Sequence, residues 1–203
     1  MMDEILTEPQ LLGWMQSLGF VVSSTAVAWL VSGWAADRWS GSWRVRAMVP
    51  ALMALWTVAV VLRFGCTVPA MAGALYGILA VSASYADLRC REVDDYIHLM
   101  LLLVGLLGTQ PQQVPAMALA AVVVSLPLLV VALCHCPLGG ADVKYTAAFG
   151  FGVGVVDGMA GLLLGLVLAI VHQSVLKKRE PGFPLIPYLS GAYLLVYFVR
   201  GGV

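Results

Sequence analysis

Apolar residues in this chain come in long runs, and short polar segments separate one run from the next. A helix needs about 20 apolar residues to cross a bilayer, although a tilted or partly covered helix can be shorter. The pattern predicts eight apolar helices, of which the fourth, sixth and eighth are short: Met15–Ala35, Ala47–Leu62, Pro69–Ala86, Tyr96–Gly108, Val114–Leu133, Val143–Val155, Met159–Leu176 and Ile186–Val199. Asp157 and Gly158 are expected to form the turn between the sixth and the seventh. Gly150, Gly152 and Gly154 suit close packing against another helix.

Composition agrees with a membrane protein. Hydrophobic residues make up 61% of the 203 residues, charged residues make up 11%, and the mean hydropathy is +0.94. We therefore expect an all-α, polytopic membrane helix bundle that forms a single domain over residues 1–203, in contact with membrane lipid. The basic residues form no continuous stripe, so no nucleic-acid partner is expected.

The basic residues also predict the orientation of the bundle. If the N-terminus lies outside, nine basic residues face the cytoplasm: Arg38, Arg44, Arg46, Arg89, Arg91, Lys144, Lys177, Lys178 and Arg179. Only Arg63 and Arg200 then face outward. The first ten residues are acidic and carry no basic residue, so we expect a retained first helix rather than a cleaved signal peptide. The predicted location is the cytoplasmic membrane.

Two aspartates, Asp87 and Asp142, lie where an apolar run meets a short polar loop. A carboxylate near membrane depth is costly, and such residues usually have a functional role. Both fall on the cytoplasmic side of the predicted topology. Each also has a purely structural interpretation: Asp142 as a helix cap after two glycines, and Asp87 as a salt-bridge partner of Arg89 or Arg91. Asp94 and Asp95 are expected to be caps of the fourth helix.

The two aspartate motifs, Asp87-Leu88-Arg89 and Gly139-Gly140-Ala141-Asp142-Val143-Lys144, resemble those of the type IV prepilin peptidases, which are GxGD membrane aspartic proteases. The proline- and glycine-rich segment 181–192 is similar to the entry of the last helix in that family, and the resemblance runs from Pro69 to the C-terminus. It implies that Asp87 and Asp142 are the catalytic aspartates and that Lys144 matches the usual lysine of the motif. Gly139, Gly140, Lys144 and Arg89 are the expected supporting residues, although simple membrane anchoring also explains the two cations.

The chain departs from the family pattern in two places. Ala141 replaces the glycine before the second aspartate, and Val93-Asp94-Asp95 replaces an isoleucine, proline and asparagine. The loop near residues 36–46 is short and carries no cysteine, whereas longer members have a cysteine-bearing loop there that is associated with methylation. We therefore expect peptidase activity without methyltransferase activity.

The resemblance implies an aspartic endopeptidase that cleaves a prepilin-like precursor, whose basic leader precedes an apolar helix, at the cytoplasmic interface. Two neighbouring carboxylates share one proton, so that one accepts a proton from water while the other donates one. Two alternatives remain: a GxGD protease with another membrane or secreted precursor as substrate, and a small proton-coupled transporter.

No cofactor and no metal are expected. Cys134-His135-Cys136 offers three metal ligands, but adjacent positions rarely place three on one tetrahedral site. The four cysteines, Cys66, Cys90, Cys134 and Cys136, are expected to be buried at helix ends.

Overall fold

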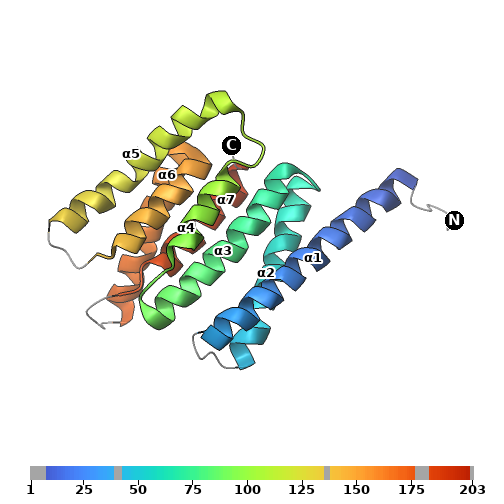
Figure 1. The fold of residues 1–203 in the computed structure, drawn as a ribbon, viewed down its shortest axis with the longest axis horizontal. Coiled ribbons are helices and arrows are strands. Elements are labelled where there is room, and N and C mark those ends of the chain that lie inside the picture. The colour runs from blue at the N-terminus through green and yellow to red at the C-terminus, as the bar shows by residue number, and fades with distance from the viewer. Residues whose placement is uncertain (1–7, 39–42, 135–137, 177–182, 202–203) are drawn as a thin grey trace.

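The computed structural model describes residues 8–38, 43–134, 138–176 and 183–201 (Figure 1). Within these ranges the chain forms seven α-helices and one short 3-10 turn, and it contains no β-strand. The elements are α1 (Glu8–Arg38), α2 (Trp43–Phe64), α3 (Val68–Cys90), α4 (Asp95–Gly105), η1 (Pro111–Gln113), α5 (Val114–Leu133), α6 (Gly140–Leu176) and α7 (Ile186–Arg200). The predicted all-α fold class is confirmed. Residues 1–7 and the Lys177–Arg179 cluster, which two of the predictions concern, lie outside the described residues.

The helices lie side by side, with α1 at one outer edge and α5 at the other (Figure 1). The helix α2 packs between α1 and α3, while α7 packs against both α3 and α6. In the described residues, α3, the segment Pro111–Leu133 and the segment Gly140–Val175 are long and apolar enough to cross a membrane. Shorter apolar stretches occur at Met15–Val31, Met48–Phe64 and Asp95–Gly105. These lengths and compositions fit a membrane helix bundle.

The long helix α6 reverses direction at Gly154, where φ is 82° and ψ is 177°. A Cβ atom on Gly158 would lie 3.3 Å from the Cα of Gly150, although a straight helix would separate two residues eight positions apart by about 12 Å. The two halves of α6 are therefore antiparallel, which gives eight helical segments, as predicted. The predicted turn at Asp157 and Gly158 is wrong, because both residues are helical and the chain turns at a backbone conformation that suits only glycine.

The glycines before this turn allow the close packing predicted for them. A Cβ on Gly150 would lie 3.2 Å from the carbonyl oxygen of Ala120 in α5, and one on Gly152 would lie 3.3 Å from the Cα of Gly105 in α4. Small residues let helix backbones approach in this way inside a membrane bundle. The prediction holds for Gly150 and Gly152, whereas Gly154 forms the turn itself.

An aromatic stack joins α3, α6 and α7 at the centre of the bundle. The ring of Phe149 in α6 stacks on Tyr76 of α3 at 5.1 Å and on Tyr193 of α7 at 4.8 Å. All three side chains are buried. Because the stack contacts α3, α6 and α7 at once, it fixes how these helices lie relative to one another.

The contacts divide the bundle into two ends. At the first, α3 ends and α4, α6 and α7 begin; Lys144 lies 2.7 Å from Asp95 there, and Asp87 contacts Ile186. We call this the aspartate end. At the opposite end, the Arg200 guanidinium lies 3.4 Å from the Asp157 carboxylate. Arg63 lies over the adjacent Phe64 ring, which packs on Tyr197. The two basic residues predicted to face outward thus share one end of the bundle.

Candidate active site

Asp87 lies in the last turn of α3 and is only 8% exposed. Its Oδ2 accepts a hydrogen bond from the backbone N–H of Ile186, the first residue of α7, at 3.1 Å. The first N–H groups of a helix have no partner within the helix and carry a partial positive charge. Asp87 therefore caps α7 from a different helix, and this contact holds one of its oxygens in place.

Asp142 is the third residue of α6 and is 9% exposed. Its Oδ2 accepts a hydrogen bond from the backbone N–H of Gly139 at 3.2 Å, and its own N–H donates to the Gly139 carbonyl at 3.1 Å. A carboxylate at this position of a helix commonly reaches back to the residue that precedes the first turn. Asp142 therefore does not occupy the N-cap position, but its carboxylate does bind a backbone N–H at the start of α6, and this contact fixes the direction of the side chain.

The glycine-rich motif allows this close contact. A Cβ on Gly139 would lie 3.3 Å from the Asp142 Oδ2, whereas one on Gly140 would meet open space. Ala141, which replaces a glycine of the family pattern, is helical and does not have positive φ. The substitution therefore leaves the backbone of the motif unstrained, and of the two supporting glycines Gly139 has the direct structural role.

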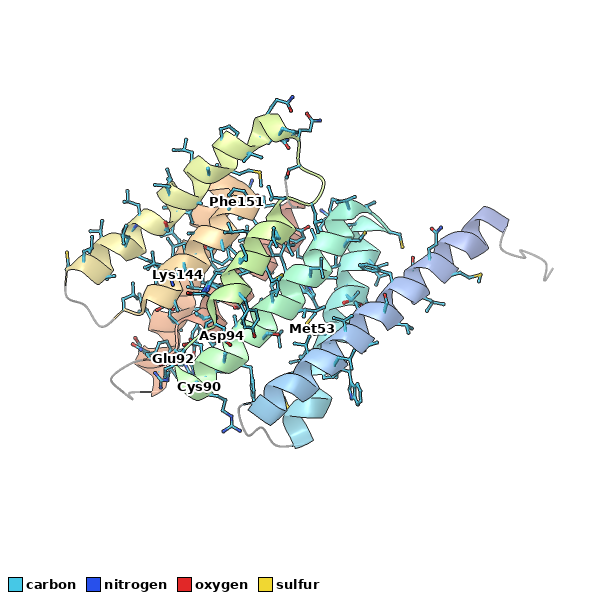
Figure 2. All side chains as sticks on the ribbon, in the orientation of Figure 1. Met53, Cys90, Glu92, Asp94, Lys144 and Phe151 are labelled. Atoms are coloured by element: carbon cyan, nitrogen blue, oxygen red, sulfur yellow. The ribbon has the colours of Figure 1, made fainter. Side chains whose placement is uncertain are left out.

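The structure brings the two aspartates together at the aspartate end, where Asp87 and Asp142 interact electrostatically. Each carboxylate holds one oxygen to a backbone N–H, from Ile186 and Gly139 respectively. The residues around this end are visible in Figure 2, where Cys90, Glu92, Asp94 and Lys144 gather at the end of α3 and the beginnings of α4 and α6. The arrangement is a pair of buried carboxyl groups at the ends of two helices.

The two cations expected to support the site contact other residues. Lys144 donates a hydrogen bond to Asp95 at 2.7 Å, and Arg89 lies 5.9 Å from the centre of the Tyr85 ring. The Arg91 guanidinium is the one that interacts electrostatically with Asp87, although the described residues show no ion pair between them. Arg91 has φ of 59° and ends α3, and its N–H donates to the Asp87 carbonyl at 3.1 Å. Sequence reasoning gave it only an anchoring or salt-bridge role.

A buried hydroxyl network lies one helical turn inside the bundle from both aspartates. The Ser84 hydroxyl of α3 donates to the Ser190 hydroxyl of α7 at 2.9 Å, and Ser190 is also hydrogen-bonded to the Tyr145 hydroxyl of α6. Ser84 comes three residues before Asp87, and Tyr145 three residues after Asp142. The network therefore ties together the two helices that carry the aspartates. The sequence analysis did not predict this network. The only signal for it in the sequence is that Ser84 and Tyr145 each lie three residues from an aspartate.

The residues at the start of α4 have contacts that the sequence did not predict. Asp94 is at the N-cap position but makes no side-chain capping bond, and Asp95 pairs with Lys144 instead of capping. The hydrogen bond and charge of Lys144 hold the pKa of Asp95 below its usual range. His98 is buried beside this pair, with its Nδ1 3.9 Å from the Asp95 Oδ1. These contacts hold the start of α4 against the first turn of α6.

The cysteines and histidines contribute no metal site to the part of the chain that the structure describes. Cys66, Cys90 and Cys134 are free and exposed, so the expectation that they are buried is wrong; each lies at or just beyond a helix end. His135 and Cys136, with which Cys134 would form a metal site, lie outside the described residues. His172, in α6, is hydrogen-bonded through Nδ1 to the Tyr188 hydroxyl at 2.5 Å.

Comparison with known proteins supports the motif assignment. Residues 74–173 match the model of the type IV leader peptidase family, and this span includes both Asp87 and Asp142. No curated protein and no solved structure matches the chain. The matched span runs from α3 through most of α6, so it covers both aspartate motifs and the helices that hold them. The chain is a membrane protein and belongs to the type IV leader peptidase family.

Proposed function

We propose that this protein is an aspartic endopeptidase that cleaves prepilin-like precursors, with Asp87 and Asp142 as its catalytic pair. The observation that carries the proposal is the convergence of these two buried carboxyl groups, 55 residues apart in the chain, at one end of the bundle. Membership of the leader peptidase family supports the peptidase part of the proposal. The assignment of the catalytic type depends on the pair itself.

The geometry suits the activation of water. One oxygen of each carboxyl group is held by a backbone N–H, which leaves the other oxygen of each to bind water or substrate. Two like charges in a poorly solvated site are most stable when they share a proton. In the proposed reaction the ionised carboxylate takes a proton from the attacking water while the protonated one donates its proton to the carbonyl oxygen. When the C–N bond breaks, the first carboxyl group gives its proton to the leaving amine and the second takes one back from a hydroxyl of the intermediate, so that the pair again holds one proton.

The position of the pair also suits this chemistry. Both aspartates lie at helix ends, where water can enter, and an ionised carboxylate is far less costly there than at the centre of a bilayer. Arg89, Arg91 and Lys144 lie at the same end, so the positive-inside rule favours a cytoplasmic location for it. We include in the proposal that residues 1–203 form one peptidase domain in the cytoplasmic membrane.

The proposed substrate has a short basic leader in the cytoplasm and an apolar helix in the bilayer. A cut at the aspartate end separates these two parts at the membrane surface. The reaction hydrolyses the peptide bond with water as its only other reactant. The two carboxyl groups carry out all the proton transfers.

The test is cleavage of such a precursor by purified protein in detergent. Asp87→Asn and Asp142→Asn are each expected to lower the cleavage rate by at least about a thousandfold, since each removes one half of the acid–base pair. Asp157→Asn is the matched control, because Asp157 pairs with Arg200 at the opposite end. It is expected to retain the wild-type rate. Circular dichroism and size-exclusion profiles of all three variants check that they are folded.

Retained cleavage by a folded Asp87→Asn or Asp142→Asn variant would rule out the proposed pair. Loss of cleavage in all three variants would mean that the effect does not depend on the site.

A further inference from the structure

A groove of about 400 Å³ runs along the outer face of the bundle between α2, α3 and α7. The surface of the groove is almost entirely apolar. Three of the side chains that line it, Met48, Leu52 and Leu88, are 60%, 52% and 56% exposed. Ser84 and Ser190 also line it. These two hydroxyls are already hydrogen-bonded to each other, so the groove presents an apolar surface to its surroundings.

The groove reaches the candidate active site at one end. Leu88, which lines it, directly follows Asp87, and Pro187, which also lines it, directly follows Ile186. Ile186 is the residue whose N–H is bound by the Asp87 carboxylate. From there the groove extends along α3 to Ala80 and along α7 to Leu194, away from the aspartate end.

Position distinguishes this groove from a second apolar one between α1 and α3. The second groove contacts α3 between Met71 and Ile78. Ile78 lies nine residues before Asp87, which corresponds to about 13 Å along a helix. A peptide bound there would not bring its backbone to the catalytic pair without further movement.

The order of polar and apolar surfaces along the site matches the order of the two parts of the proposed substrate. The charged residues Arg89, Arg91 and Glu92 follow Leu88, the last residue of α3 that lines the groove, and the apolar groove runs from Leu88 past Asp87 toward Ala80. A precursor has a charged leader before the cut and an apolar helix after it. A chain that crosses the aspartates in this direction would lay the first residues of its apolar helix in the groove.

We propose that the groove between α2, α3 and α7 binds the apolar helix of the precursor, immediately after the bond that is cut. This inference rests on the proposed function and adds to it the surface that recognises the substrate. Packing rather than the hydrophobic effect drives helix contacts within a bilayer, so the fit of the groove decides the affinity. The groove then contributes to KM for substrates that contain the helix.

Gly191 offers a direct test, since it lines the groove and a Cβ on it would have no atom within 4 Å. Gly191→Trp places a large side chain in the groove, at a position where the added Cβ meets no other atom. Gly19→Trp is the matched control, because Gly19 is also an exposed helical glycine with nothing within 4 Å, but on α1. Two substrates are compared: a synthetic precursor with a basic leader and a 20-residue apolar helix, where about 20 residues span a bilayer, and a short peptide with the same leader and cut site but a polar tail.

Gly191→Trp is expected to raise KM for the helix-bearing precursor at least tenfold and to leave the short peptide unaffected, while Gly19→Trp changes neither. Equal KM values for wild type and Gly191→Trp on the precursor would overturn the proposal, as would an equal loss on both substrates.

A second measurement does not depend on cleavage. A photo-crosslinking residue at Leu52, in the groove, is expected to capture the helix-bearing precursor, whereas one at Leu18, an exposed residue of α1, is not. Capture at Leu52 by a protein that cleaves neither substrate would support binding of the apolar helix in the groove and refute the proposed protease function. Equal capture at Leu52 and Leu18, or capture at Leu18 alone, would refute the groove.

Discussion

Ser190→Ala tests whether the buried hydroxyl network holds the two aspartate-bearing helices in place. The Ser190 hydroxyl is hydrogen-bonded to Ser84 in α3, to the Ala80 carbonyl and to Tyr145 in α6. Its removal leaves the fully buried Tyr145 hydroxyl without a partner among the described residues. Hydrogen bonds between membrane helices contribute about 0.6 kcal/mol on average and up to about 1.7 kcal/mol, and an orphaned buried hydroxyl costs about 1–3 kcal/mol. We expect a loss of about 1–2 kcal/mol of unfolding free energy.

A double-mutant cycle with Tyr145→Phe isolates this interaction. In the double variant no hydroxyl is orphaned, so its loss of stability is expected to be smaller than the sum of the two single losses by about 1 kcal/mol. The measurement is reversible unfolding in mixed micelles, followed by tryptophan fluorescence. Ser125→Ala is the control, because the Ser125 hydroxyl donates only within its own helix, to Ala121 at 2.7 Å and to Val122; its effect should stay below about 0.5 kcal/mol. Losses that add to within about 0.3 kcal/mol would refute the network as a link between helices.

Three further predictions concern stability. Gly152→Ala places a Cβ in steric conflict with the Tyr76 hydroxyl, so it should lower the unfolding free energy by about 1–3 kcal/mol. Tyr76→Phe should recover part of this loss, and no recovery would contradict the clash. Gly154→Ala puts a side chain at φ of 82° and should cost about 1–3 kcal/mol in the same assay, whereas Gly191→Ala, at a helical site, should cost less; equal losses would contradict the turn. The contact with Lys144 lowers the pKa of Asp95 in the folded state. The stabilisation from this contact is therefore fully present above the ordinary aspartate pKa of about 3.9, and it is lost as the pH falls through the lowered pKa. The difference in melting temperature between wild type and Asp95→Asn should therefore shrink below about pH 4, and a difference that is constant with pH would contradict this.

The number of helical segments was predictable because membrane helices depend on long apolar runs that are visible in the sequence. The position of the turn in α6 was not, since Asp157-Gly158 and Gly154 both carry turn-forming residues. Packing decides between them: a Cβ on Gly158 would lie 2.7 Å from a methyl group of Val124, so Gly158 is needed inside the helix for close contact with α5. Contacts of this kind join residues far apart in the chain and leave no local signal.

The aspartates themselves were predictable, because an acid in an apolar chain is rare and costly. Their surroundings were less so. The sequence directed attention to Arg89 and Lys144, which follow the aspartates by two residues, but the cation whose charge acts on Asp87 is Arg91, which ends α3. Ser190 lies 106 residues from Ser84, and Ile186 lies 99 residues from Asp87, so these partners come together only through the fold.

The central claim is that Asp87 and Asp142 form one site, and the titration of their carboxyl groups tests it most directly. Carbon-13 NMR of aspartate-labelled protein in detergent can follow the Asp87 carboxyl in wild type and in Asp142→Asn. If the two groups share a site, neutralising Asp142 changes the titration curve of Asp87, and Asp87→Asn changes that of Asp142 in return. Identical curves for Asp87 with and without the Asp142 charge would contradict the account.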